Sequence, residues 1–130
     1  MCIESYFACL VGNTGNPRAW RALEKAAKRC DVGLRMELMG ELCRFGAKHS
    51  KEQLAFLSAF LDDSTLRDMN SDPRRFEGFP AGDDFARLEV RNYAALEFGR
   101  LLKLKRTPEP TWNDEQWAQF RTEVRKALGS

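Results

Sequence analysis

Residues 88–102 read LEVRNYAALEFGRLL, and this stretch decides the fold class. Its apolar residues recur every three or four positions, which is the period of an α-helix and not of a β-strand. The same spacing recurs along most of the chain and predicts six helices. They span about 2–11, 17–30, 32–48, 51–62, 88–104 and 113–128. We therefore expect an all-α fold without a β-sheet.

The composition is that of one globular domain. The chain has 130 residues, of which 43% are hydrophobic and 31% charged, and such values suit a single domain with its own core. Its net charge of +2 creates no overall field that would attract nucleic acid or anionic lipid. No apolar run approaches the roughly 18–20 residues of a membrane span. The first twelve residues lack the basic start of a signal peptide, so we expect a cytoplasmic protein.

Residues 64–87 are the one long segment without helical spacing. Prolines and glycines interrupt this segment, which is unusually long for a connection inside a small domain. It also contains Phe76, Phe79 and Phe85, which make it too apolar for a free linker. We expect an ordered loop that packs on the surface of the helices.

An internal repeat relates two of the predicted helices. When the chain is shifted by 56 positions, 32–48 overlays 88–104, and three charged residues coincide. At about 100° per residue, four charged side chains then fall inside apolar helix faces. These are Arg35 and Glu41 in the first copy and Arg91 and Glu97 in the second. A buried charge needs a partner, so we predict a charge ladder between stacked helices; the alternative is that these long side chains extend to the edge of the face.

The stretch 88–102 resembles the V-R-x-x-A-A-x-x-L-G run in the second helix of a HEAT repeat, with Asp84 near the place of the family's acidic residue. The earlier copy, 31–46, matches more loosely. The offset of 56 exceeds the usual repeat of about 40–47 residues, and the 64–87 segment accounts for the excess as an insertion. The resemblance implies a short right-handed α-solenoid whose second helices line a concave face. Such arrays mostly bind proteins and sometimes nucleic acid.

The 64–87 segment also holds the candidate binding residues. It mixes arginine and aromatic side chains of the kind that dominate protein interfaces; they are Arg74, Arg75, Phe76, Glu77 and Phe79. The alternative is that the phenylalanines fill the concave groove instead. We expect a non-catalytic protein-interaction or scaffold module that acts as a monomer or a homodimer, with an unidentified protein as its partner.

A nucleic-acid-binding domain is the first alternative. The outer face of the 17–30 helix carries five basic residues against Glu24. A second basic cluster closes the 88–104 helix and consists of Arg100, Lys103, Lys105 and Arg106. Such clusters can neutralise phosphates in a salt-dependent manner. They also suit a solvated helix surface, which is the interpretation that the low net charge favours.

A helical enzyme or accessory subunit is the second alternative. Its candidate groups are the acidic pairs at 62–63 and 83–84, which border the long loop and could act as an acid and a base or hold a metal. His49 is the single histidine, and the four cysteines form no C-x-x-C pair. We therefore expect no metal site, no cofactor and no catalytic residue.

Overall fold

A computed structural model describes residues 16–45, 51–68 and 87–129, which hold five helices and one small sheet. The helices are α2 (Pro17–Arg29), α3 (Val32–Phe45), α4 (Lys51–Ser58), α5 (Val90–Leu101) and α6 (Asp114–Leu128). The strands are β1 (Leu66–Asp68) and β2 (Arg87–Glu89). The prediction of a mainly helical fold is confirmed. The predicted helix over 2–11 lies outside the described residues.

Side-chain caps fix the starts of three helices, and at α3 the Oδ1 of Asp31 accepts a hydrogen bond of 3.0 Å from the Leu34 N–H. The Oδ1 of Asn16 accepts a hydrogen bond of 3.0 Å from the Arg18 N–H, and Pro17 occupies the first turn, where its missing donor costs nothing. At α6, Asn113 and Gln116 form a capping box with reciprocal bonds of 2.8 and 2.9 Å. These caps explain why α2, α3 and α6 begin where they do.

The expectation of a fold without a sheet is wrong, because β1 and β2 pair antiparallel with Leu66 opposite Glu89. The ladder continues into α5, since the Val90 N–H donates to the Thr65 carbonyl at 2.9 Å. Two three-residue strands are too short to show an alternating pattern. The alternation of apolar and polar residues is further obscured because a charged residue, Arg67, is buried and only 1% exposed. The 64–87 segment is therefore strand at both of its ends, and residues 69–86 lie outside the described part.

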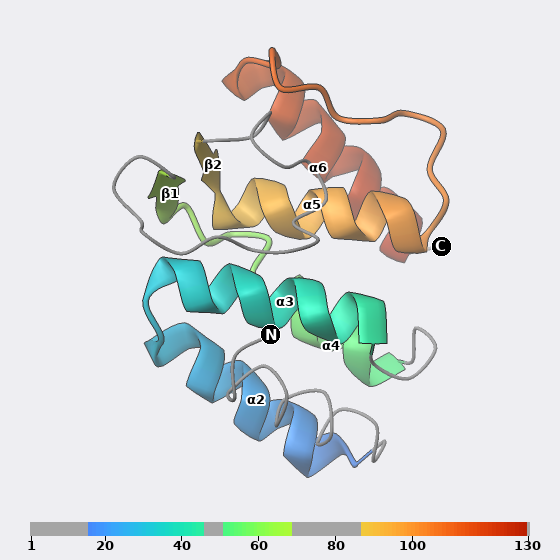
Figure 1. Cartoon of the computed structure of the whole chain (residues 1–130). Coiled ribbons are helices and arrows are strands. Elements are labelled where there is room, and N and C mark those ends of the chain that lie inside the picture. The colour runs from blue at the N-terminus through green and yellow to red at the C-terminus, as the bar shows by residue number, and fades with distance from the viewer. Residues whose placement is uncertain (1–15, 46–50, 69–86, 130) are drawn as a thin grey trace.

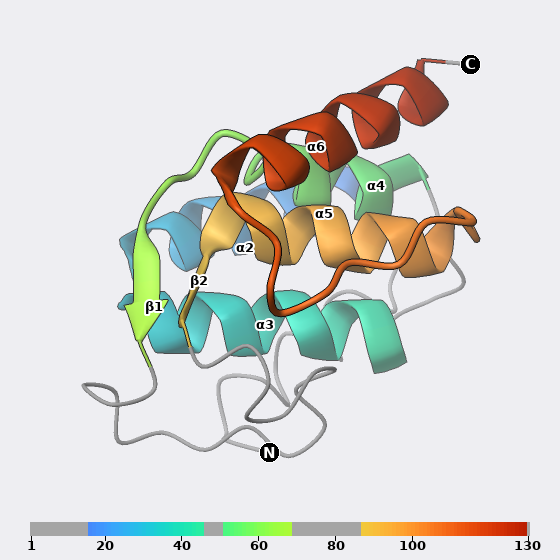
Figure 2. The ribbon, with the colours of Figure 1, turned by 90° about the horizontal axis from the view of Figure 1, so that it is seen from above.

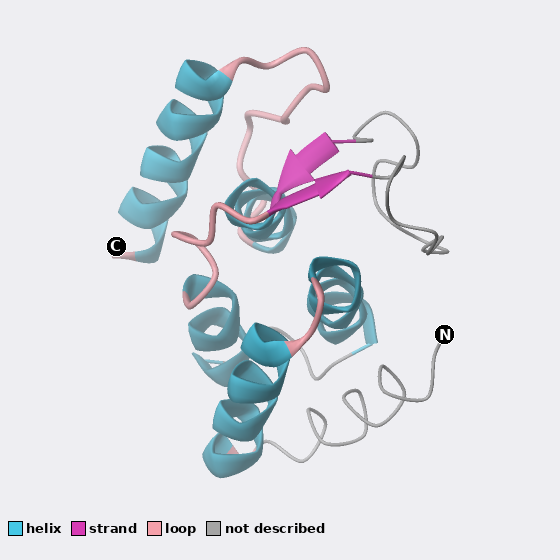
Figure 3. Cartoon of the chain, turned by 90° about the vertical axis from the view of Figure 1, so that its left-hand side faces the viewer, coloured by secondary structure: helices cyan, strands magenta, loops and turns pink. Residues whose placement is uncertain are grey.

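The helices pack as two hairpins in two layers. Helix α2 packs against α3 and α4, while α3 and α4 each pack against α5. Helices α3 and α5 run side by side in the same direction, as Figure 1 shows. Figure 3 looks almost along both axes, with α2 and α4 beside them. The pair α2–α3 thus packs against the pair α4–α5, and α6 packs on α5 as well.

Helix α5 is the centre of the core. Nine of its residues between Val90 and Gly99 are buried, and it lies between α3 and α6 (Figure 2). Glycine residues let α5 lie close to α3 on one side and to α6 on the other. A Cβ atom at Gly40 of α3 would lie 2.5 Å from the hydroxyl of Tyr93, and one at Gly99 would lie 2.9 Å from Cζ of Phe120 in α6. The absence of a side chain at these two positions therefore permits the close spacing of α3, α5 and α6.

Candidate functional site

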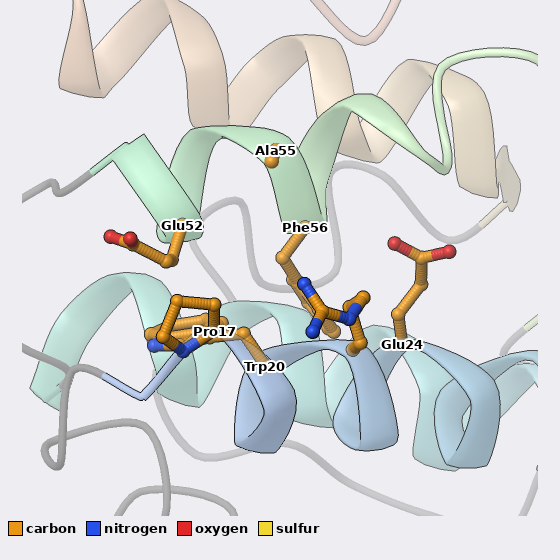
Figure 4. A pocket seen from close by; sticks show the side chains of 7 residues that line it. Pro17, Trp20, Glu24, Glu52, Ala55 and Phe56 are labelled. Atoms are coloured by element: carbon orange, nitrogen blue, oxygen red, sulfur yellow. The ribbon is translucent and has the colours of Figure 1, made fainter.

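A small pocket lies between α2 and α4. Its volume is about 100 Å³, and side chains from the first two turns of α2 face others from α4 across it (Figure 4). The lining residues are Pro17, Trp20, Arg21, Glu24, Glu52, Ala55 and Phe56. We call this feature the α2–α4 pocket.

Two buried aromatic rings form the base of the pocket. Trp20 and Phe56 are 3% and 2% exposed, and their ring centroids lie 5.8 Å apart in an edge-to-face arrangement. Phe56 packs in turn on Phe60 at 5.2 Å, which joins the pocket to the core. Edge-to-face pairs hold their rings in defined positions. The base is therefore apolar and fixed in shape.

The indole N–H of Trp20 is buried and has no hydrogen-bond acceptor in the described part of the chain. A buried donor without an acceptor costs about 1–3 kcal/mol, and most such donors in native proteins have a partner. Burial closes this nitrogen to solvent, so the surface that the base of the α2–α4 pocket offers to a ligand is apolar.

Charged side chains border the pocket. Glu24 forms an ion pair of 3.3 Å with Lys28 on the outside of α2. Arg21 is exposed and Glu52 half-buried, and neither forms an ion pair with another described residue. Within that part of the chain, the rim therefore offers one unpaired cation and one unpaired anion beside an apolar base.

Arg35, predicted to belong to a charge ladder, joins three segments. Its guanidinium donates to the carbonyls of Ala27, Lys28 and Cys30 at 3.0, 3.2 and 2.9 Å, and to the Asp63 carboxylate at 2.8 Å. These carbonyls end α2, where the helix dipole favours a cation. Burial raises the pKa of Asp63, but hydrogen bonds from Thr65 and the charge of Arg35 outweigh burial and lower this pKa overall. Arg35 therefore connects α2, α3 and the segment after α4.

The other predicted ladder residues have more local partners. Arg91 pairs with Glu89, and both side chains are about one quarter to one third exposed. Glu97 is 2% exposed and accepts from Arg100 at 3.3 Å. The side chain of Glu41 lies outside the described part. Of these contacts, only that of Arg35 reaches a different helix layer, so a continuous ladder stays a prediction.

The predicted binding residues Arg74, Arg75, Phe76, Glu77 and Phe79 all lie outside the described ranges. The second basic cluster is partly engaged within the chain. Arg106 binds Glu123 at 2.9 Å and lies over the ring of Trp112 at 4.7 Å. Lys103 and Lys105 are exposed.

The acidic pair at 62–63 is engaged in ion pairs. Asp62 accepts from Arg125 of α6 at 2.6 Å, and Asp63 accepts from Arg35. The acidic pair at 83–84, His49 and three of the four cysteine side chains lie outside the described part of the chain. Over 16–45, 51–68 and 87–129, no three histidine, cysteine or acidic side chains gather as metal ligands would. In those same ranges, none of the helices has the length and apolarity to cross a bilayer.

Sequence reasoning missed the α2–α4 pocket. Helical spacing predicts the 17–30 helix that contains Trp20, but it gives no indication that α2 lies beside α4. The detectable signal was a large aromatic residue one turn after the helix-starting Pro17. Comparison of the chain with protein-family models, curated proteins and solved structures found no match.

Proposed function

We propose that the chain is a non-catalytic protein-binding module, built as a short α-solenoid, whose α2–α4 pocket accepts one side chain of a partner. The solenoid part of this proposal is supported by the stacking of two helix pairs, in which α2 packs on α4 and α3 on α5. It is also supported by the resemblance of 88–102 to a HEAT helix.

The observation that carries the binding proposal is the fixed aromatic base of the pocket. Tryptophan, arginine and a pocket closed to water are features of interface hot spots. An apolar side chain placed against Trp20 and Phe56 would be desolvated. The pocket therefore offers an apolar contact to a peptide, and the exposed Arg21 at its rim offers a charged one.

The volume of the pocket favours a side chain over a cofactor. Sites for small organic ligands typically enclose about 300–1,000 Å³, whereas the α2–α4 pocket encloses about 100 Å³. One aliphatic side chain suits this space. A nucleotide or flavin would extend far beyond it.

A peptide-display experiment tests the proposal. The full chain is used to select from a random peptide library, and the enriched peptides are titrated against two variants. Ala55→Leu places extra carbons at the pocket, whereas Ala118→Leu makes the same change at an exposed position of α6. We expect Ala55→Leu to weaken binding at least tenfold, about 1.4 kcal/mol, and Ala118→Leu to leave it unchanged. Equal affinity for both variants, or no enrichment, would contradict the proposal.

We also propose that the candidate residues between 74 and 79 take part in binding the partner. The same selected peptides are titrated against Arg74→Glu combined with Arg75→Glu. Weaker binding to this variant would extend the binding surface beyond α2 and α4. Unchanged binding would remove these arginines from the proposed interface.

A further inference from the structure

The outer face of α2 carries a row of five basic side chains. At about 100° per residue they fall within an arc of roughly 100°, and they extend over roughly 16 Å of the helix axis. All are exposed. We call this row the basic stripe, and it consists of Arg18, Arg21, Lys25, Lys28 and Arg29.

Little negative charge opposes the basic stripe. Glu24 is the one acidic residue of α2, and its ion pair with Lys28 joins side chains that are 32% and 50% exposed. The helix therefore keeps a net charge of +4. No ion pair with described residues engages the other four basic side chains.

Helix stability explains only part of this charge, because Lys28 and Arg29 lie in the last turn of α2, where the dipole favours cations, and the other three basic residues do not. The N-terminal turn of a helix favours acidic residues, because the helix dipole is positive there. Helices α4 and α6 follow this rule, with Glu52 in the first turn of one and Asp114 and Glu115 in the first turn of the other. The first turns of α2, α3 and α5 have no acidic residue, and those of α2 and α5 contain Arg18 and Arg91. The dipole therefore does not stabilise Arg18, which stays available to a partner.

The surroundings of the stripe favour a protein partner over a nucleic acid. Single-stranded nucleic acids stack their bases on exposed aromatic rings, but Trp20 and Phe56 are buried. Beside the stripe, Ala22 and Ala26 are exposed and small, which lets a peptide backbone approach α2 closely.

We propose that an acidic protein segment binds along the basic stripe, with one apolar side chain at its end in the α2–α4 pocket. This inference rests on the proposed function, since the pocket provides the apolar anchor. The stripe meets the pocket at Arg21, which belongs to both. A segment anchored there would place its following carboxylates beside the cations of successive helical turns.

The test uses synthetic fluorescent peptides as probes for the full chain. One peptide carries a leucine followed by alternating acidic and small residues. The second replaces this leucine by serine, and the third replaces the acidic residues by lysine. A single-stranded oligonucleotide of similar length is the fourth probe. Binding is followed by fluorescence anisotropy at low and at physiological salt.

Matched charge reversals separate the stripe from general electrostatics. Arg18→Glu with Lys25→Glu changes the stripe, and Lys103→Glu with Lys105→Glu makes an equal charge change at exposed positions after α5. Arg18→Glu also places an acid where the helix dipole favours it. We therefore expect the stripe variant to melt at or above the temperature of the wild type. We expect it to bind the acidic leucine peptide at least tenfold more weakly, while the control variant binds within twofold.

Four outcomes would overturn the inference. The first is that both charge-reversal variants weaken binding equally, and the second is that the oligonucleotide binds more tightly than the acidic peptide. The third is that the lysine peptide binds as strongly as the acidic peptide. The fourth is that the acidic peptide does not bind at a concentration of about 1 mM. If binding requires the leucine but is unaffected by the charge reversals in the stripe, the proposed role of the stripe is refuted and that of the pocket is not. Stripe-dependent binding that is insensitive to Ala55→Leu would refute the pocket of the proposed function instead.

Discussion

Replacing Arg35 by glutamine removes the guanidinium that joins the end of α2 to the segment after α4. The side chains of Arg35 and Asp63 are 11% and 18% exposed, and their ion pair measures 2.8 Å. Breaking one partner of a fully buried pair costs about 3–5 kcal/mol, and an exposed pair contributes about 0–1 kcal/mol. For this mostly buried pair we expect a loss of about 2–4 kcal/mol in the free energy of unfolding. That corresponds to roughly 10 °C in Tm for a domain of this size.

Urea denaturation followed by circular dichroism measures this loss, with Arg91→Gln as the matched control. The repeat aligns Arg91 with Arg35, but the Arg91 side chain is 31% exposed and its partner Glu89 is 25% exposed. We expect the control to lose about 1 kcal/mol or less. A double-mutant cycle with Asp63→Asn should give a coupling of about 1–2 kcal/mol.

The result that would refute this reasoning is an equal loss at both arginines. A continuous charge ladder predicts such equality, because it gives the two repeat positions the same role. A lone connection at Arg35 predicts a difference of at least about 1 kcal/mol. Arg35→Lys should recover little stability, since one ammonium cannot reach both Asp63 and the carbonyls at the end of α2.

Packing, capping and titration each lead to a further prediction. Gly99→Ala should lower the free energy of unfolding by about 1–3 kcal/mol, because the new Cβ would lie 2.9 Å from Phe120; a denaturation midpoint equal to that of the wild type would contradict the close contact. Asn113→Ala should cost about 1 kcal/mol through loss of the capping box with Gln116, and Asn113→Asp, which keeps an acceptor, should recover most of it in the same assay. The pKa of Asp63 is lower in the folded chain than in the unfolded chain. The stabilisation that the Asp63 carboxylate gives to the fold is therefore complete above the unfolded pKa of about 3.9 and is lost as pH falls through the folded pKa. Asp63→Asn should reduce the dependence of Tm on pH in acid, and an unchanged dependence would contradict this assignment.

Much of the helical fold could be predicted from the sequence, because its signals are local. Asn16 and Asn113 are helix-starting residues that act through bonds to the next two or three residues. The apolar spacing of 88–102 likewise identified the central helix, although Leu88 and Glu89 belong to β2 and not to α5. The helix begins two residues later than predicted because backbone pairing of β2 with β1 competes with the first helical turn.

The pocket and the sheet depend on contacts between distant residues, which leave no local pattern along the chain. Trp20 and Phe56 are 36 positions apart and meet because α2 lies beside α4. An arginine such as Arg67 is expected from the sequence to be exposed, yet Arg67 is buried in β1. The repeat correctly marked Arg35 as a charge that needs a partner, but Asp63, which lies outside the repeated helices, could not be identified by a match between those helices.

The pairing of β1 with β2 makes the chain suitable for grafting. Antiparallel partners lie about 4.5–5.5 Å apart, so the Asp68–Arg87 pair holds the two ends of the intervening sequence at a constant separation. Doubling the length of a flexible closed loop costs only about 0.6 kcal/mol. A peptide epitope or an affinity tag inserted between these strands would therefore meet the same two anchor points whatever its length, and α5 would still begin at Val90.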